Sequence, residues 1–185
     1  QDMVTYAYHG SGQSAFKIIN STHRDGGGHE SAGYNTIKLD FIRVNRLMEQ
    51  IRQRQPERFA ADLYPDLFDN PKGKAIFDHH IDMLVDSRFI VNVGDAGNLS
   101  APSRYDKPMV SFIGPQNLYA VQRYGDPRHA RACTAPDGSL ALGELWEPYP
   151  EERIRELLAK PEAQIVRDSR LLDGYGIGIL ESGAE

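Results

Sequence analysis

Three consecutive glycines at positions 26–28 are the feature that most limits how this chain folds. Glycine adopts backbone angles that are unfavourable for other residues. Ordering glycine on folding costs more conformational entropy than ordering other residues, and a loop without a function would seldom contain three in a row. The polar residues His29 and Glu30 follow at once and lead into a helical pattern. We therefore predict a tight loop that brings His29 and Glu30 up against a ligand while a helix holds it in place.

A long amphipathic helix is predicted from residue 32 to about residue 53. Its apolar side chains recur at intervals of 4, 3, 4 and 3 and form one stripe: Ile37, Phe41, Val44, Met48 and Ile51. Tyr34 and Asn35 fall in its first turn, where the helix would hold the phenol in place. The plain alternative is that Ser31 caps the helix and Tyr34 is a packing residue.

The rest of the chain indicates further helices and one strand. The helices are expected at 13–22, 71–88, 115–124, 127–133 and 150–160. Tyr175, Ile177 and Ile179 alternate with glycines, which predicts a strand near the end, one without a pairing partner.

Length and composition bound the fold class and the partners. The 185 residues suffice for one ordinary domain, and 40% hydrophobic with 25% charged residues is typical of a globular protein. A net charge of −5 without a basic stripe argues against nucleic acid. No apolar run approaches the roughly 20 residues of a membrane helix. The single cysteine, Cys133, excludes an intramolecular disulfide and a cysteine metal cluster.

A second polar loop and a basic patch offer further candidate ligand contacts. The loop covers residues 94–105, and its useful side chains are Asp95, Asn98 and Arg104, unless it is merely an exposed connection. The densest basic patch, which an anionic ligand could use, consists of Arg123, Arg128, His129 and Arg131.

Three segments of the chain resemble segments of one known family, and they occur in the same order as in that family. The first is Asp-Gly-Gly-x-x-Glu-Ser-x-Gly-Tyr at 25–34, preceded by Tyr8-His9-Gly10. It is similar to the segment that carries the catalytic tyrosine of the heparinase II/III-like polysaccharide lyases. Residues 172–183 (Leu-Asp-Gly-Tyr-Gly-Ile-Gly-Ile-Leu-Glu-Ser-Gly) resemble the strand that opens the β-sandwich of that family. Val-Gly-Asp-Ala-Gly at 93–97 is similar to its Gly-Asp loop.

The resemblance implies a mainly α fold, with part of an α/α toroid over residues 1–165 and the start of a β-sandwich over 166–185. It also implies that the chain is a fragment, inactive alone, which the missing initiator methionine and the abrupt end at Glu185 also favour. In the family, the carboxylate-neutralising residues, a further histidine and the metal-site residues lie outside the matched segments. No cofactor is therefore expected within this chain, and a structural divalent metal would belong to the remaining β-sandwich.

The implied reaction is β-elimination of a uronic-acid-containing polysaccharide of heparan or alginate type, with Tyr34 as general base and acid. Because an unperturbed phenol has a pKa near ~10, positive or hydrogen-bonding neighbours must lower it. The predicted substrate contacts are His29, Glu30, Asn35, Arg24, Asp95, Asn98 and Arg104. The expected partners are an acidic polysaccharide or oligosaccharide and the remainder of the polypeptide, in the periplasm or outside the cell.

Two other functions stay open. A glycoside hydrolase on a similar toroid needs two carboxylates, for which Glu30 and Asp95 are the plausible pair. A non-catalytic carbohydrate-binding or structural module has no activity to lose, and Tyr34→Phe would leave its affinity for ligand unchanged. Products separate the two enzymes, because elimination leaves an unsaturated sugar that absorbs ultraviolet light.

Overall fold

The computed structural model describes residues 3–10, 15–30, 35, 41–85, 89–90, 116–134, 137–140, 149–164 and 168–182. The helical elements are α1 (Met3–Thr5), the π-helical turn η1 (Tyr6–Gly10), α2 (Ala15–Ser21), α3 (Phe41–Arg54), α4 (Pro71–Asp82), α6 (Gln116–Tyr124), α7 (Pro127–Ala132), α8 (Glu151–Leu158) and the short turn η4 (Pro161–Ala163). The strands are β1 (Leu84–Val85), β2 (Phe89–Ile90), β3 (Arg170–Leu172) and β4 (Ile177–Ile179). The described fold is therefore predominantly helical, which confirms the mainly α prediction.

Local signals begin the two helices at the centre of the fold. Asn70 accepts a hydrogen bond from the Lys72 backbone amide at 3.0 Å and caps α4. Asp126 accepts one from the Arg128 amide at 2.9 Å and caps α7. A proline follows each cap, and its fixed φ suits the first helical position. Both starts agree with the expected positions.

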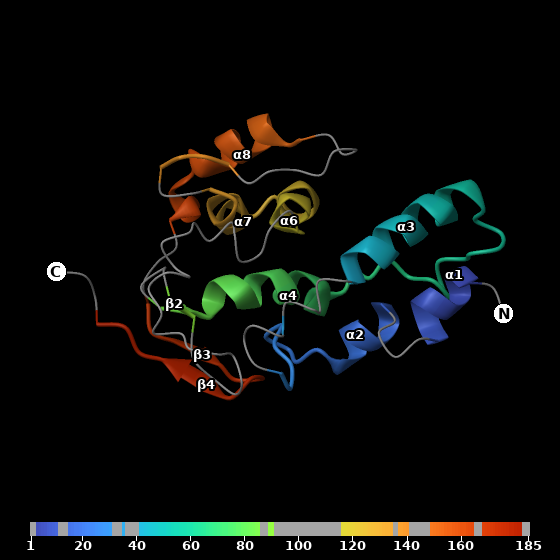
Figure 1. The fold of residues 1–185 in the computed structure, drawn as a ribbon, viewed down its shortest axis with the longest axis horizontal. Coiled ribbons are helices and arrows are strands. Elements are labelled where there is room, and N and C mark those ends of the chain that lie inside the picture. Colours follow the sequence, from blue (N-terminus) through green and yellow to red (C-terminus); the bar gives the residue numbers. More distant parts are fainter. Residues whose placement is uncertain are drawn as a thin grey trace.

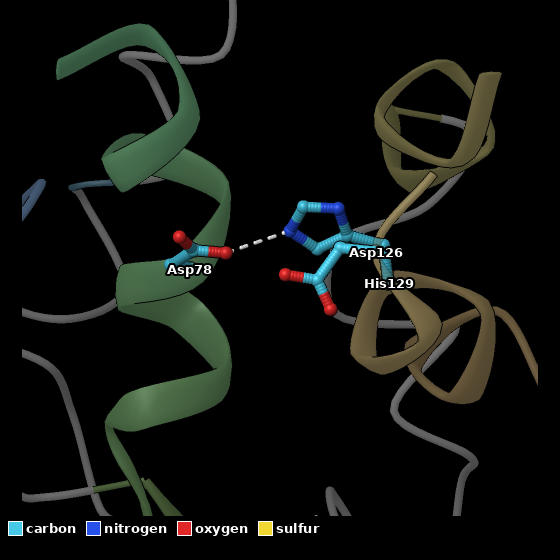
Figure 2. Close-up of side chains that lie close together, drawn as sticks. All are labelled: Asp78, Asp126 and His129. Atoms are coloured by element: carbon cyan, nitrogen blue, oxygen red, sulfur yellow. Dashed lines mark hydrogen bonds and ion pairs between the residues drawn. The ribbon is translucent and has the colours of Figure 1, made fainter. Parts of the chain in front are cut away.

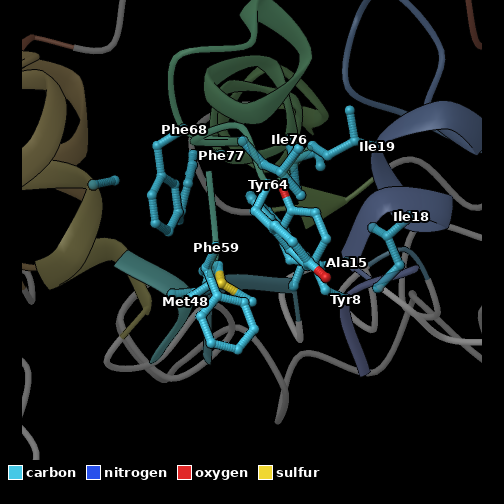
Figure 3. Packing of buried hydrophobic residues seen from close by; sticks show 14 residues of the cluster. Tyr8, Ala15, Ile18, Ile19, Met48, Phe59, Tyr64, Phe68, Ile76 and Phe77 are labelled. Carbon is cyan, nitrogen blue, oxygen red and sulfur yellow. The ribbon is translucent and has the colours of Figure 1, made fainter. Parts of the chain in front are cut away.

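The helices pack in layers around α4 (Figure 1). Helix α8 lies over α6 and α7, and these two pack on α4. Helices α2 and α3 contact each other, and α3 also contacts η1. The largest buried cluster joins these N-terminal helices to α4, where Ile76 and Phe77 are fully buried (Figure 3). None of the described helices combines the length and the apolar character needed to cross a membrane.

The apolar stripe predicted for the long helix is confirmed over Phe41–Arg54. Phe41 and Met48 are buried, and Val44 and Ile51 are half-buried against the same cluster. Residues 31–34 and 36–40 lie outside the described residues, so the predicted start of this helix stays a prediction.

The predicted helix 71–88 was wrong at residues 83–85, and residues 86–88 lie outside the described residues. The chain turns at Met83 and enters β1, which pairs antiparallel with β2. Met83 and Leu84 are buried in a separate cluster with Leu172 and Ile179 of the C-terminal hairpin. Burial against a distant segment therefore ends the helix, and local periodicity carries no trace of such a contact.

The prediction of an unpaired C-terminal strand was also wrong. Strand β4 was expected, but it pairs antiparallel with β3 in the register Arg170↔Ile179 and Leu172↔Ile177. A tight turn with φ +81° at Gly176 joins the two strands. The short β3 segment lacks a clear alternating pattern, so the sequence showed only one half of the hairpin.

Candidate functional site

The glycine-rich loop closes on itself and packs against α4. The His23 backbone amide donates to the Gly27 carbonyl at 2.8 Å, and the Gly26 amide donates to the His23 carbonyl at 3.1 Å. Gly26 has φ +84°, and a Cβ there would lie 1.9 Å from the Ala75 carbonyl oxygen. Glycine permits both this backbone angle and this close approach. The tight loop predicted from the three glycines is therefore present at Gly26.

Asp25 joins the loop to the β3–β4 hairpin. Its Oδ1 accepts a hydrogen bond from the Gly27 amide at 3.2 Å, and its Oδ2 accepts one from the Tyr175 amide at 2.7 Å. A Cβ at Gly174 would lie 2.8 Å from Asp25 Oδ1, so a glycine in the hairpin allows the close approach. Hydrogen bonds to a charged acceptor are stronger than neutral ones. The carboxylate thus holds together segments that are distant in the sequence.

Arg24 makes a second link to the hairpin. Its Nε and Nη2 donate to the two carboxylate oxygens of Asp173 at 2.8 and 2.7 Å. The side chains are 71% and 49% exposed, so this pair adds little to stability. It does direct the guanidinium toward the hairpin. The role predicted for Arg24 beside Tyr34 stays a prediction, since Tyr34 lies outside the described residues.

One backbone carbonyl, that of Glu30, accepts two side-chain hydrogen bonds. The Tyr175 hydroxyl donates to it at 2.5 Å, and Asn35 Nδ2 donates at 3.2 Å. Asn35 is buried, and its Oδ1 has no hydrogen-bond partner in the part of the chain that the structure describes. Burial raises the pKa of Tyr175 above its usual value, and the Asn35 side chain opposes this rise. The phenol is therefore protonated at neutral pH and acts as a donor.

Three imidazole rings surround the loop. His23 and His29 meet edge to face with ring centroids 4.7 Å apart. His79, buried on α4, lies within hydrogen-bond distance of the Asp25 carbonyl oxygen, at 3.2 Å from Nδ1, and its ring meets Tyr175 edge to face at 5.2 Å. His29 is exposed, so its ring can contact a ligand from solvent. The site thus combines imidazole, phenol, amide and carboxylate groups, which can accept, donate or orient protons.

Four predicted site residues fall in the described part of the chain and gather around this loop: Arg24, His29, Glu30 and Asn35. The predicted catalytic residue Tyr34 and the predicted contacts Asp95, Asn98 and Arg104 lie outside the described residues.

Sequence reasoning missed two contributors, His79 and Tyr175. No motif in the sequence marks His79, whose ring centroid lies 5.9 Å from that of its neighbour His80. Tyr175 was assigned only to a strand. Its place in Asp173-Gly174-Tyr175, inside a segment already singled out by resemblance, was the available signal.

A second polar cluster lies between α4 and α7 (Figure 2). Asp78, Asp126 and His129 offer ligand atoms within 4.8 Å of one another, a spacing compatible with a metal ion. His129 Nε2 lies 2.8 Å from Asp78 Oδ1, and the ring is fully buried. Burial raises the pKa of Asp78, but hydrogen bonds from His129 and Lys74 outweigh it and leave the pKa below its usual range.

Lys74 and Arg128 form ion pairs with these carboxylates. Lys74 Nζ lies 2.8 Å from Asp78 Oδ2 and 2.8 Å from Asp126 Oδ2. Arg128 contacts Asp78 at 3.2 Å and Asp82 at 3.0 Å. Because an ammonium bridges both acids, we interpret the cluster as an ion network that joins α4 to α7.

Two residues of the predicted basic patch, Arg123 and Arg128, are paired with acids. Arg123 pairs with Asp66 at 3.0 Å and with Asp69 at 2.6 Å, and Arg128 belongs to the network described above. The acids come mainly from distant segments, Asp66 and Asp69 for Arg123 and Asp78 and Asp82 for Arg128, and Asp126 next to α7 adds a contact to Arg128 at 3.6 Å. An anionic ligand would therefore meet paired rather than free guanidinium groups there.

The chain was compared with known protein families, curated sequences and solved structures. No protein-family model, curated protein sequence or solved structure matches the chain.

Proposed function

We propose that this chain is part of a polysaccharide lyase that cleaves a uronic-acid-containing polysaccharide by β-elimination. The observation that carries the proposal is the contact between described residues of the two sequence segments with the clearest resemblance to such lyases, 25–34 and 172–183. They meet through the bonds of Asp25 to Tyr175 and of Tyr175 to the Glu30 carbonyl. Two segments that form one site should be in contact. Segments so far apart in the sequence need not be in contact, so the contact supports a shared site.

Elimination needs three chemical roles from the protein: a base, an acid and a donor that stabilises negative charge. A base removes the proton on the carbon next to the uronate carboxylate, and the freed electron pair forms the new double bond. The bond to the glycosidic oxygen breaks, and an acid supplies that oxygen with a proton. A donor must also stabilise the carboxylate as negative charge develops on it. No oxidant or cofactor enters this balance.

In the proposed site, Tyr34 removes and returns the proton. Asn35 follows it directly and binds the Glu30 carbonyl, so the residues on either side of 31–34 are held to each other. His29, an exposed residue of the loop, orients the substrate carboxylate, and the Glu30 side chain orients a substrate hydroxyl. Asp25 and Asp173 are engaged by backbone amides and by Arg24, which limits their repulsion of an acidic polymer.

The proposal extends to the fold and the setting. Residues 1–165 belong to an incomplete α/α toroid, and 166–185 begin a β-sandwich. The layered helices and the terminal hairpin are compatible with this division. The substrate is an acidic polysaccharide or oligosaccharide, met in the periplasm or outside the cell together with the rest of the polypeptide.

The test uses the natural full-length polypeptide and a panel of uronic acid polymers. Ultraviolet absorbance follows unsaturated ends, and a reducing-sugar assay follows all new chain ends. We expect ultraviolet-absorbing product from the native protein and none from Tyr34→Phe. Tyr6→Phe is the control, because Tyr6 is a half-exposed phenol on η1. New reducing ends without absorbance would indicate a hydrolase, and polymer binding without new ends would indicate a non-catalytic module. Either outcome overturns the proposal.

A further inference from the structure

The Tyr175 hydroxyl donates to a backbone carbonyl of the loop at an exposed position. This hydroxyl lies 2.5 Å from the Glu30 carbonyl oxygen, which also accepts from Asn35 Nδ2 at 3.2 Å. Two donors from two directions fix the orientation of a peptide group better than one. This carbonyl belongs to Glu30, next to His29 in the chain, and the side chains of both residues are exposed.

The hairpin gives Tyr175 a firm base. Leu172 and Ile179 are buried with Met83 and Leu84, and the Gly176 amide donates to the Leu172 carbonyl at 2.8 Å. The Tyr175 amide is held by Asp25. A phenol anchored on a paired strand hairpin is a more accurate support for a loop than another loop residue.

The Tyr175 ring also packs closely against the loop at Gly27. A Cβ at Gly27 would lie 3.1 Å from Tyr175 Cδ2 and 2.8 Å from His79 Cε1. The glycine therefore passes close between two rings that meet edge to face. Ring packing and hydroxyl bonding act on different parts of the loop, and a Tyr→Phe exchange separates them.

We propose that Tyr175 is a positioning residue of the candidate site, whose hydroxyl holds the Glu30 carbonyl and thereby sets where the His29 and Glu30 side chains point. The inference rests on the proposed lyase function for its catalytic consequence. Its structural consequence, a loop held by the hairpin phenol, is measured without any substrate.

The experiment compares Tyr175→Phe with Tyr124→Phe in the natural full-length protein. Tyr124 is the matched control, because its hydroxyl also donates to a backbone carbonyl, that of Phe68 at 3.1 Å, in the main core. Amide hydrogen exchange at residues 26–30 should quicken about fivefold in Tyr175→Phe, the size of one neutral hydrogen bond. It should stay at the native rate in Tyr124→Phe.

Steady-state kinetics on the polymer cleaved by the native protein supply the second readout. We expect kcat to fall about 10- to 100-fold in Tyr175→Phe with KM nearly unchanged, because misplaced groups cost rate more than binding. A purely structural contribution would affect both variants alike. Native exchange rates in Tyr175→Phe, or an equal kcat in the two variants, would overturn the inference. A native protein without elimination activity would refute the proposed function, and exchange would still decide whether Tyr175 holds the loop.

Discussion

The Asp25 carboxylate accepts the backbone amide proton of Tyr175 at 2.7 Å, across a sequence separation of 150 residues. This bond joins the glycine-rich loop to the turn of the C-terminal hairpin. Asp25 also accepts the Gly27 amide, so one side chain shapes the loop and attaches it. The candidate site thus depends on two segments that no local pattern connects.

Gly26→Ala should destabilise the protein far more than Gly176→Ala. Both glycines have positive φ, +84° and +81°, so each alanine carries a backbone cost of about 1 to 2 kcal/mol. At Gly26 the new Cβ also meets the Ala75 carbonyl at 1.9 Å, whereas nothing lies within 4 Å at Gly176. We expect roughly 2 kcal/mol more loss at Gly26, measured by urea unfolding. Equal losses at the two positions would contradict the tight packing of the loop on α4.

Lys74→Met should cost more stability than Arg155→Met. Each cation pairs with an acid one helical turn away, but Lys74 bridges Asp78 and Asp126 between two helices, whereas the Arg155–Glu151 pair is 67% and 53% exposed. We expect about 2 kcal/mol at Lys74, below the roughly 3 to 5 kcal/mol of a fully buried pair. The exposed pair should cost under about 0.5 kcal/mol. Similar unfolding midpoints for the two variants would mean that the network is not a structural tie.

The ion network should make the protein sensitive to acid. Burial alone would raise the pKa of Asp126, but hydrogen bonds from Lys74 and the Arg128 amide lower it to about 2. A carboxyl with a depressed folded pKa stabilises above its unfolded pKa of about 3.9, and that contribution is lost as pH falls toward 2. Asp82 has the opposite sign, since burial raises its pKa, and offsets part of the loss.

Urea midpoints measured from about pH 5 to about pH 2 test this dependence. Asp126→Asn keeps an acceptor for the Arg128 amide but cannot titrate, so its stability should fall less steeply with acid than that of the native protein. Parallel curves for the two proteins would show that Asp126 does not carry the effect.

The Cys133 thiol should be unreactive in the folded protein. The side chain is fully buried, and burial raises the pKa of the thiol to about 12. Because the thiolate is the reactive form, a disulfide reagent at about pH 8 should modify Cys133 far more slowly than it modifies the same protein in urea. Equal rates in the two conditions would place Cys133 at the surface.

Helices were predictable from the sequence where an apolar face or a local start signal is sufficient to specify them. Phe41 and Met48 follow a period that any packed helix must show, and the prolines after Asn70 and Asp126 indicate helix starts through φ alone. The end of α4 was not predictable. Leu84 is buried against Leu172 of the hairpin, and a helical period extended past this point without any sign of that contact.

The same division holds for the candidate site. The glycine-rich loop was predictable, because backbone freedom at Gly26 and polar side chains at His29 and Glu30 are properties of neighbouring residues. The contributions of His79 and Tyr175 were not, because each reaches the loop from a separate element.

By itself, the sequence determined where most of the longer helices lie, where the chain can turn sharply and which side chains can carry chemistry, because these follow from local sterics and periodicity. Only the tertiary structure decided the partners. It paired Arg123 with Asp66, so that this guanidinium of the basic patch is engaged by an acid, and it brought Tyr175 to Glu30. The physical reason is that hydrogen bonds and ion pairs depend on distance in space, and a single sequence records only distance along the chain.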